Sequence, residues 1–175
     1  PTLDIQPTTP IQPVVKPAPV VVPEPAEEVE ITEPAELLPQ VVSPLDGTTV
    51  TVFSMTELLY DPTMADWRTH DGIDVQADEG AAVKTAAGGT VQSVTDDELM
   101  GTTVVIAHDG GYATRYSSLQ KDVPVTQGQQ VAAGEIIGYV GSTSAAESRM
   151  GSHLHFSVSR DGAVIDPHDY VNGDE

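Results

Sequence analysis

Short runs rich in β-branched residues recur along residues 41–175, and turn sequences that contain glycine separate them. Many short strands with closely spaced turns are typical of an all-β domain, because βαβ units need helices between their strands. The pattern therefore predicts an all-β fold. The runs that we expect to form strands are residues 41–47 (a short strand and a turn), 48–53, 90–95, 102–107, 112–116 and 136–140.

Three connecting segments carry expectations of their own. Asp161-Gly162, between two apolar runs, predicts a β-hairpin turn. We expect residues 55–67 to form a loop or a short helical turn. The glycine rhythm of residues 127–138 also occurs in biotinyl and lipoyl carrier domains, but Lys121 lacks the exposed setting of a carrier lysine. We therefore interpret residues 127–138 as scaffold.

Residues 1–40 differ in composition from the rest of the chain. They hold ten of the 14 prolines, together with the acidic run Glu27-Glu28-Val29-Glu30. Proline at this density favours an extended, polyproline-like conformation, and the acidic run adds self-repulsion. The sequence therefore predicts a disordered Pro/Glu-rich stalk or linker at residues 1–40 and one domain at residues 41–175.

Charge and cysteine content narrow the classes of partner and site. The chain has 27 acidic and seven basic residues, and residues 41–175 alone have 20 acidic and six basic ones. This excess of negative charge argues against nucleic acid and against anionic membrane surfaces as partners. The absence of cysteine excludes disulfides and thiolate metal ligands. No stretch of the sequence has the apolar length needed to span a bilayer.

Histidines and an aspartate in two short segments are the candidate chemistry. His153 and His155 are two residues apart, so on a strand both side chains point to the same face. His70 and Asp74 are four apart, which also returns to the same face of a strand, and Gly72 allows a bend between them. Two imidazoles and a carboxylate match a catalytic zinc site that keeps one position open for water. Each histidine alone could be a surface or satisfied core residue, and the joint pattern favours a metal site.

Five sequence motifs follow one another in a fixed order along the domain. They are H-D-G-I-D at 70–74, A-G-G-T-V at 87–91, G-T-T-V-V-I-A-H-D-G-G-Y at 101–112, the V-x-x-G rhythm through Gly141, and H-L-H-F at 153–156. Together they make the chain similar to the lysostaphin/LytM family of zinc metallopeptidases, which cleave peptide cross-links in bacterial cell walls. The resemblance covers about residues 46–170 and implies a small antiparallel β-sheet or β-sandwich. It also implies one zinc ion with His70, Asp74 and His155 as ligands, and His153 as the residue that helps to polarise the attacking water.

Two positions depart from the pattern of this family. Active members have a further catalytic histidine in a Y-x-H-L phrase, where this chain has Ser118, and they usually have glutamate where this chain has Ser157. A positioned imidazole that exchanges protons contributes typically ~10²–10⁴-fold to the rate, and a serine hydroxyl cannot replace it at neutral pH. His108 fits a structural turn of the family. The resemblance therefore implies a zinc site whose catalysis is impaired.

Ser118, the stalk and residues 55–70 further resemble the stage II sporulation protein Q family, particularly its clostridial members. The resemblance implies an N-terminal membrane anchor upstream of Pro1 and a location on the forespore membrane, facing the space between forespore and mother cell. It implies a protein-binding module whose partner is a membrane protein of the stage III sporulation protein AH type, in a channel between the two cells. Peptidoglycan is a second candidate partner.

Two other functions remain open. One is an active zinc metalloendopeptidase that cleaves peptidoglycan cross-links, against which stand Ser118 and the negative charge of the domain. The other is an activator of a cell-wall amidase. Activators of that kind usually lack the zinc ligands and carry coiled-coil segments, whereas this chain keeps the ligands and has no heptads. The binding module is the preferred hypothesis.

Overall fold

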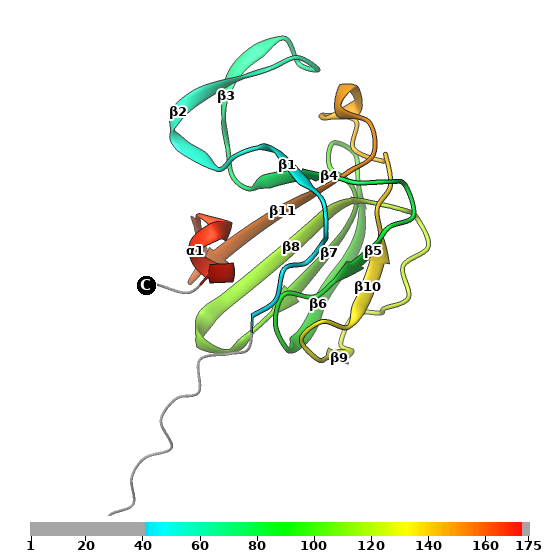
Figure 1. Cartoon of the computed structure of the whole chain (residues 1–175). Helices are drawn as coiled ribbons and strands as arrows, with labels where there is room; N and C mark the ends of the chain where they lie inside the picture. Colours follow the sequence, from blue (N-terminus) through cyan, green and yellow to red (C-terminus); the bar gives the residue numbers. More distant parts are fainter. Residues whose placement is uncertain (1–40, 173–175) are drawn as a thin grey trace, which may run out of the picture. The chain divides into compact units, whose positions relative to one another are not determined.

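The computed structural model describes residues 41–172 as a β-rich domain that ends in a short helix (Figure 1). The expected stalk at residues 1–40 lies outside the described residues. The elements are β1 (Thr48–Thr51), β2 (Ser54–Asp61), β3 (Asp66–His70), β4 (Ile73–Gln76), β5 (Ala82–Lys84), β6 (Gly89–Asp97), β7 (Gly101–Ala107), η1 (Asp109–Gly111), β8 (Tyr112–Leu119), β9 (Gln130–Val131), β10 (Ile136–Tyr139), η2 (Ser148–Met150), β11 (His153–Arg160), β12 (Ala163–Ile165) and α1 (Pro167–Asn172).

One antiparallel sheet forms the centre of the domain. Its strands follow the order β1-β4-β11-β8-β7-β6-β9, and β12 pairs with β11 through the hairpin turn expected at Asp161-Gly162. Two smaller antiparallel sheets, β5–β10 and β2–β3, complete the strands. The prediction of an all-β, antiparallel fold is confirmed. In the order of the main sheet β4, β11 and β8 are neighbours, which matters below because their residues surround the candidate site.

Two of the expected elements were wrong. Residues 55–67 form most of the β2–β3 hairpin rather than a loop or helical turn, and Tyr60 and Trp67 face each other across it with ring centroids 5.5 Å apart. Both strands are largely exposed, so their sequence lacks the alternation of buried and exposed residues that indicates a strand. Residues 41–47 contain no strand. Proline at position 44 has no N–H to continue a ladder, and the segment is held by separate bonds such as that from Lys84 N to Pro44 O.

The core of the domain lies against the main sheet. Tyr116 of β8 and Phe156 of β11 are register partners, and their fully buried rings lie 5.2 Å apart. The hydroxyl of Tyr116 accepts a hydrogen bond from the backbone N–H of Ala86 at 2.8 Å, so the ring also anchors the segment that leads into β6. The other large side chains without exposure are Val83, Val91, Val104, Ile106, Leu119, Ile137, Val140 and Leu154.

No helix within residues 41–172 is long and apolar enough to cross a membrane.

The buried hydroxyl of Tyr116 gives a test of this packing. Tyr116→Phe keeps the ring but leaves the N–H of Ala86 without its acceptor, which costs about 1–3 kcal/mol of the free energy of unfolding. Tyr60→Phe is the matched control, because the side chain of Tyr60 is exposed. Urea unfolding followed by circular dichroism measures both. Equal stability of the two variants would contradict the anchoring role of Tyr116.

Candidate metal centre

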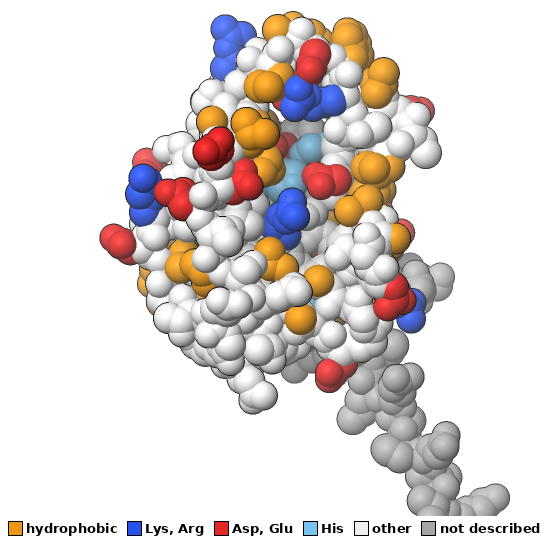
Figure 2. Space-filling model, turned by 180° about the vertical axis from the view of Figure 1, so that it is seen from behind, with side chains coloured by type: hydrophobic (Ala, Val, Ile, Leu, Met, Phe, Trp, Pro, Cys, Tyr) orange, Lys and Arg blue, Asp and Glu red, His pale blue; other side chains and the backbone are white. Residues whose placement is uncertain are grey.

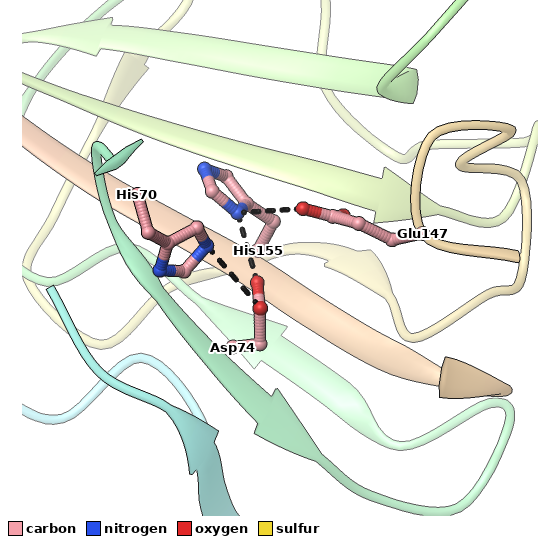
Figure 3. Close-up of side chains that lie close together, drawn as sticks. All are labelled: His70, Asp74, Glu147 and His155. Carbon is pink, nitrogen blue, oxygen red and sulfur yellow. Dashed lines mark hydrogen bonds and ion pairs between the residues drawn. The ribbon is translucent and has the colours of Figure 1, made fainter. Parts of the chain in front are cut away.

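Four side chains from three parts of the chain converge at one end of β4 and β11 (Figure 3). His70 is the last residue of β3, Asp74 lies in β4, His155 lies in β11, and Glu147 precedes η2. One nitrogen or carboxylate oxygen of each lies within 4.8 Å of those of the others. The structure therefore brings together the three residues expected to bind a metal and adds Glu147, which the sequence analysis missed.

The backbone explains why three of these groups meet. Antiparallel pairing of β4 with β11 places Asp74 directly opposite His155. His70 and Asp74 lie on two successive strands, and the turn between them passes close to β11. A Cβ atom on Gly72 would lie 2.5 Å from the carbonyl oxygen of Phe156 and 2.9 Å from Nε2 of His155. Only glycine therefore fits at the turn that returns the chain from His70 to Asp74.

The distances between the inner atoms suit a bound ion. His70 Nε2 lies 3.2 Å from Asp74 Oδ2, and His155 Nδ1 lies 2.9 Å from Asp74 Oδ1. Donor atoms at 2.0–2.1 Å from a tetrahedral zinc ion lie about 3.3 Å from each other. His70 Nε2 is buried and faces Asp74 Oδ2 without a well-directed hydrogen bond. A buried imidazole nitrogen and a carboxylate oxygen in this relation can serve as two ligands of one metal ion.

The outer nitrogens of the two imidazoles face oxygen atoms. His70 Nδ1 donates to the carbonyl oxygen of Val52 at 3.0 Å. His155 Nε2 lies 3.4 Å from the carboxylate of Asp71, which is an ion-pair distance without a hydrogen bond. An acceptor on the outer nitrogen, as in His70, fixes the tautomer and leaves the lone pair of the inner nitrogen facing the metal. Asp71 is a second residue that the sequence analysis did not single out, although it follows His70 directly.

The electrostatics of the cluster favour a cation. Burial opposes the charged imidazole of His155, but the surrounding carboxylates, Asp71 first, outweigh it and raise the pKa of His155 well above its usual range. Burial likewise opposes the charged form of Asp74, whose pKa is nevertheless lowered by the hydrogen bonds of His155 and His70. Without a metal the site therefore holds protons on its imidazoles, and a divalent ion would replace them.

His153 lies beside this group and not within it. Its Nδ1 is 2.8 Å from the carbonyl oxygen of Gly151, and its Nε2 is 3.0 Å from Oε2 of Glu147. Both partners can only accept, so these contacts favour a proton on each nitrogen, and although burial opposes it they raise the pKa of His153 above its usual value. Glu147 stays ionised, because hydrogen bonds from His153 and His155 outweigh its burial and lower its pKa to about 2.

Ser118 occupies the end of β8, one residue beyond Ser117, which pairs with His155. Its side chain is fully buried, and its hydroxyl oxygen has no hydrogen-bond partner in the described chain. Its backbone is held by Met100 and Gly141 with φ at 63°. Histidine is among the residues enriched in this left-handed region, so the backbone at this position would accept a histidine.

His108 lies outside the group, as the sequence analysis expected. Its Nδ1 is 2.8 Å from the carbonyl oxygen of Gly88, and its Nε2 is 2.7 Å from Oγ1 of Thr114. Burial lowers the pKa of His108, so the ring is a neutral structural group that ties β7 to β8 and to the start of β6.

A pocket opens above the four side chains. Figure 2 shows histidine surface at the bottom of a hollow with acidic and basic side chains around it. The β2–β3 hairpin forms one wall and the segment before β11 forms another. The lining residues outside the group of four are Thr51, Leu59, Tyr60, Asp61, Pro62, Arg68, Thr69, Asp71, Met100, Ala146 and Met150.

Two named relatives resemble part of this chain. DD-carboxypeptidase/endopeptidase Mpg of Neisseria meningitidis is 35% identical over 107 residues, which are 61% of this chain and 24% of that protein. Stage II sporulation protein Q of Bacillus subtilis is 32% identical over 103 residues, 58% of this chain and 36% of that protein. The chain thus matches well under half the length of either relative.

Solved structures and a family model agree with these relatives. The crystal structure of the SpoIIIAH and SpoIIQ complex contains a chain with a TM-score of 0.65 and 26% identity, and the match covers 74% of this chain and 99% of that chain. Residues 68–167 match the model of Peptidase family M23. This match covers more than half of the sequence, and the chain therefore belongs to Peptidase family M23.

Proposed function

We propose that this domain is a catalytically impaired member of the family that works as a protein-binding module in the channel between forespore and mother cell. The observation that carries the proposal is Ser118, a buried hydroxyl at the position where active members have a catalytic imidazole. The partner would be a membrane protein of the stage III sporulation protein AH type. The relation to stage II sporulation protein Q and the likeness to a structure of its complex support this choice.

We further propose that the domain binds one zinc ion through His70, Asp74 and His155. A zinc ion supplies a bound water of lowered pKa, and this contribution survives wherever the ligands do. The two residues that the family pattern would assign to the use of such a water do not suit that task. Ser118 cannot exchange protons at neutral pH, and the two acceptors beside His153 favour a proton on each of its nitrogens, which opposes a role as a base.

The surface of the domain suits a binding role. The β2–β3 hairpin exposes apolar side chains, among them Leu58 at 57% and Trp67 at 66% of their accessible surface. Exposed apolar groups that gather on one element indicate an interaction site. The excess of acidic residues in the domain favours a partner with a basic face. The location that supports this role is extracytoplasmic, with a membrane anchor on the forespore side.

An active zinc endopeptidase is the second candidate. It is favoured by the intact His70, Asp74 and His155 set and by the relative named as a DD-carboxypeptidase/endopeptidase. Peptidoglycan would then be the substrate. The two candidates differ in whether the domain must turn over substrate, and this difference can be measured.

Binding to the partner tests the proposed function. The domain is mixed with the soluble domain of the AH-type protein from the same organism, and complex formation is followed by calorimetry and sizing chromatography. We expect a complex whose affinity is the same for the Ser118→His variant, because binding does not use the position of the missing imidazole. Failure of the folded domain to bind would contradict the proposal. Release of new amino termini from peptidoglycan, above an Asp74→Ala control, would favour the endopeptidase.

The raised pKa values of His70 and His155 predict how metal binding depends on pH. In both, hydrogen bonds and charges of the carboxylates outweigh burial, so the metal-free site holds protons that zinc must displace. Zinc affinity should therefore fall as the pH drops from about 8 to about 5, with protons released on binding. Calorimetry in buffers of different ionisation enthalpy counts these protons.

The matched controls for this titration are two aspartates. Asp74→Ala should abolish binding, whereas Asp78→Ala, at an exposed position outside the group, should bind like the unchanged domain. A binding enthalpy that does not depend on the buffer would show that no proton leaves the site, against the expectation.

A further inference from the structure

We propose that Glu147 is the fourth protein ligand of the metal ion, so that the chain itself closes the coordination position that a peptidase leaves open for water. This inference rests on the metal site proposed above and goes beyond it. The family ligand set comprises His70, Asp74 and His155, and nothing in the motif that contains His155 points to Glu147.

The first observation is the position of the Glu147 carboxylate. Its Oε1 lies 3.3 Å from Nδ1 of His155, the nitrogen that also faces Asp74. This separation equals the distance of about 3.3 Å between two ligand atoms of a tetrahedral zinc ion. In Figure 3, Glu147 reaches His155 from the side opposite to His70, and one ligand atom of each of the four groups lies within 4.8 Å of those of the others.

The second observation is that the two oxygens of Glu147 have different surroundings. Oε2 lies 3.0 Å from Nε2 of His153 and 3.1 Å from Oγ of Ser144. Oε1 has neither partner and faces the inner atoms of the cluster. One oxygen engaged by outer groups and one directed at the metal is the arrangement expected of a carboxylate ligand with its supporting hydrogen bonds. His153, expected from the family to serve a water, here holds the carboxylate.

The third observation is that the segment carrying Glu147 is fixed by the fold. The N–H of Ala146 donates to the carbonyl oxygen of Leu99, and Ser144 Oγ accepts from the N–H of Glu147 at 3.2 Å. The guanidinium of Arg149 donates to the carbonyl oxygen of Pro62 at the tip of the β2–β3 hairpin. The Glu147 side chain is 12% exposed. The side chain of Glu147 is therefore held in place by the fold, unlike a solvated acid on the surface.

Charge is compatible with this assignment. Burying an unbalanced charge is costly, and a divalent ion held by two neutral imidazoles and Asp74 carries a net positive charge in a largely buried site. The carboxylate of Glu147 offsets part of that charge. Sites with four protein ligands are structural, and sites with three keep a water for catalysis.

Cobalt(II) provides a test that does not depend on activity, because its visible spectrum reports coordination and changes when an added anion binds. In the unchanged domain loaded with cobalt(II), azide should leave the spectrum as it is, since no position is open. In Glu147→Ala, azide should shift the spectrum. The affinity for zinc should also fall by at least the 10- to 100-fold or so that loss of an outer-shell partner costs.

Two further variants make the outcome decisive. Glu79→Ala removes an exposed glutamate outside the group and should change neither property. Glu147→Gln keeps the shape of the side chain and an acceptor for His153, and it should also open the coordination position. The role of Glu147 can therefore be tested even if the alanine variant does not fold. Circular dichroism verifies that each variant is folded.

The results separate failure of the ligand assignment from failure of the metal site. An azide response of the unchanged domain, together with equal zinc affinity in Glu147→Ala and Glu147→Gln, would overturn the role of Glu147 and leave the three-ligand site standing. With those results, Glu147 would lie beside an open coordination position, where a carboxylate can act as a general base on a bound water. An unchanged domain that binds no metal would overturn both.

Discussion

The antiparallel pairing of β4 with β11 is the interaction on which the site depends. It sets Asp74 opposite His155 and brings Nδ1 of the imidazole to 2.9 Å from the carboxylate, with both residues 1% exposed. The ladder is fixed by the core, because Leu154 and Phe156 flank His155 on the same strand and are fully buried. A shift of one residue would turn both apolar side chains out of the core and separate His155 from Asp74, so the packing of the sheet protects the geometry of the site.

Ligand geometry and catalytic chemistry lie on different parts of this fold. The proposed ligands on β3, β4 and β11 are held by the sheet and by Gly72, whereas Ser118 sits near a strand end and Glu147 lies in the connecting segment before β11. Residues of connecting segments can change without loss of the core. On the proposals above, the domain keeps its fold and its metal without the catalytic imidazole, and a carboxylate closes the site. The ion would then link β3, β4 and β11 to the segment that contacts the β2–β3 hairpin.

The elements and site residues that could be predicted from the sequence are those whose side chains recur at the fixed spacing of a strand or a turn. The two-residue spacing of His153 and His155 and the bend at Gly72 follow from the geometry of strands and turns, and the largely buried strand β7 follows from its run of β-branched residues. The β2–β3 hairpin was not predicted, because both of its faces are exposed and its sequence has no clear alternation. Glu147 was not predicted as a site residue, because it is one acid among many and has no fixed spacing from the histidines. Only the folded chain brings Glu147 to His155.

The most direct test of the four-ligand metal site is anomalous diffraction at the zinc edge from crystals of the purified domain. We expect one peak per chain and no water bound to the ion. The ligand atoms, which are His70 Nε2, His155 Nδ1 and an oxygen each of Asp74 and Glu147, should all lie about 2.0–2.2 Å from the ion. Absence of the peak would contradict the metal site. A water bound to the ion in the place of Glu147 would contradict the closed site. The coordination would then be that of a catalytic zinc site, with three protein ligands and one open position.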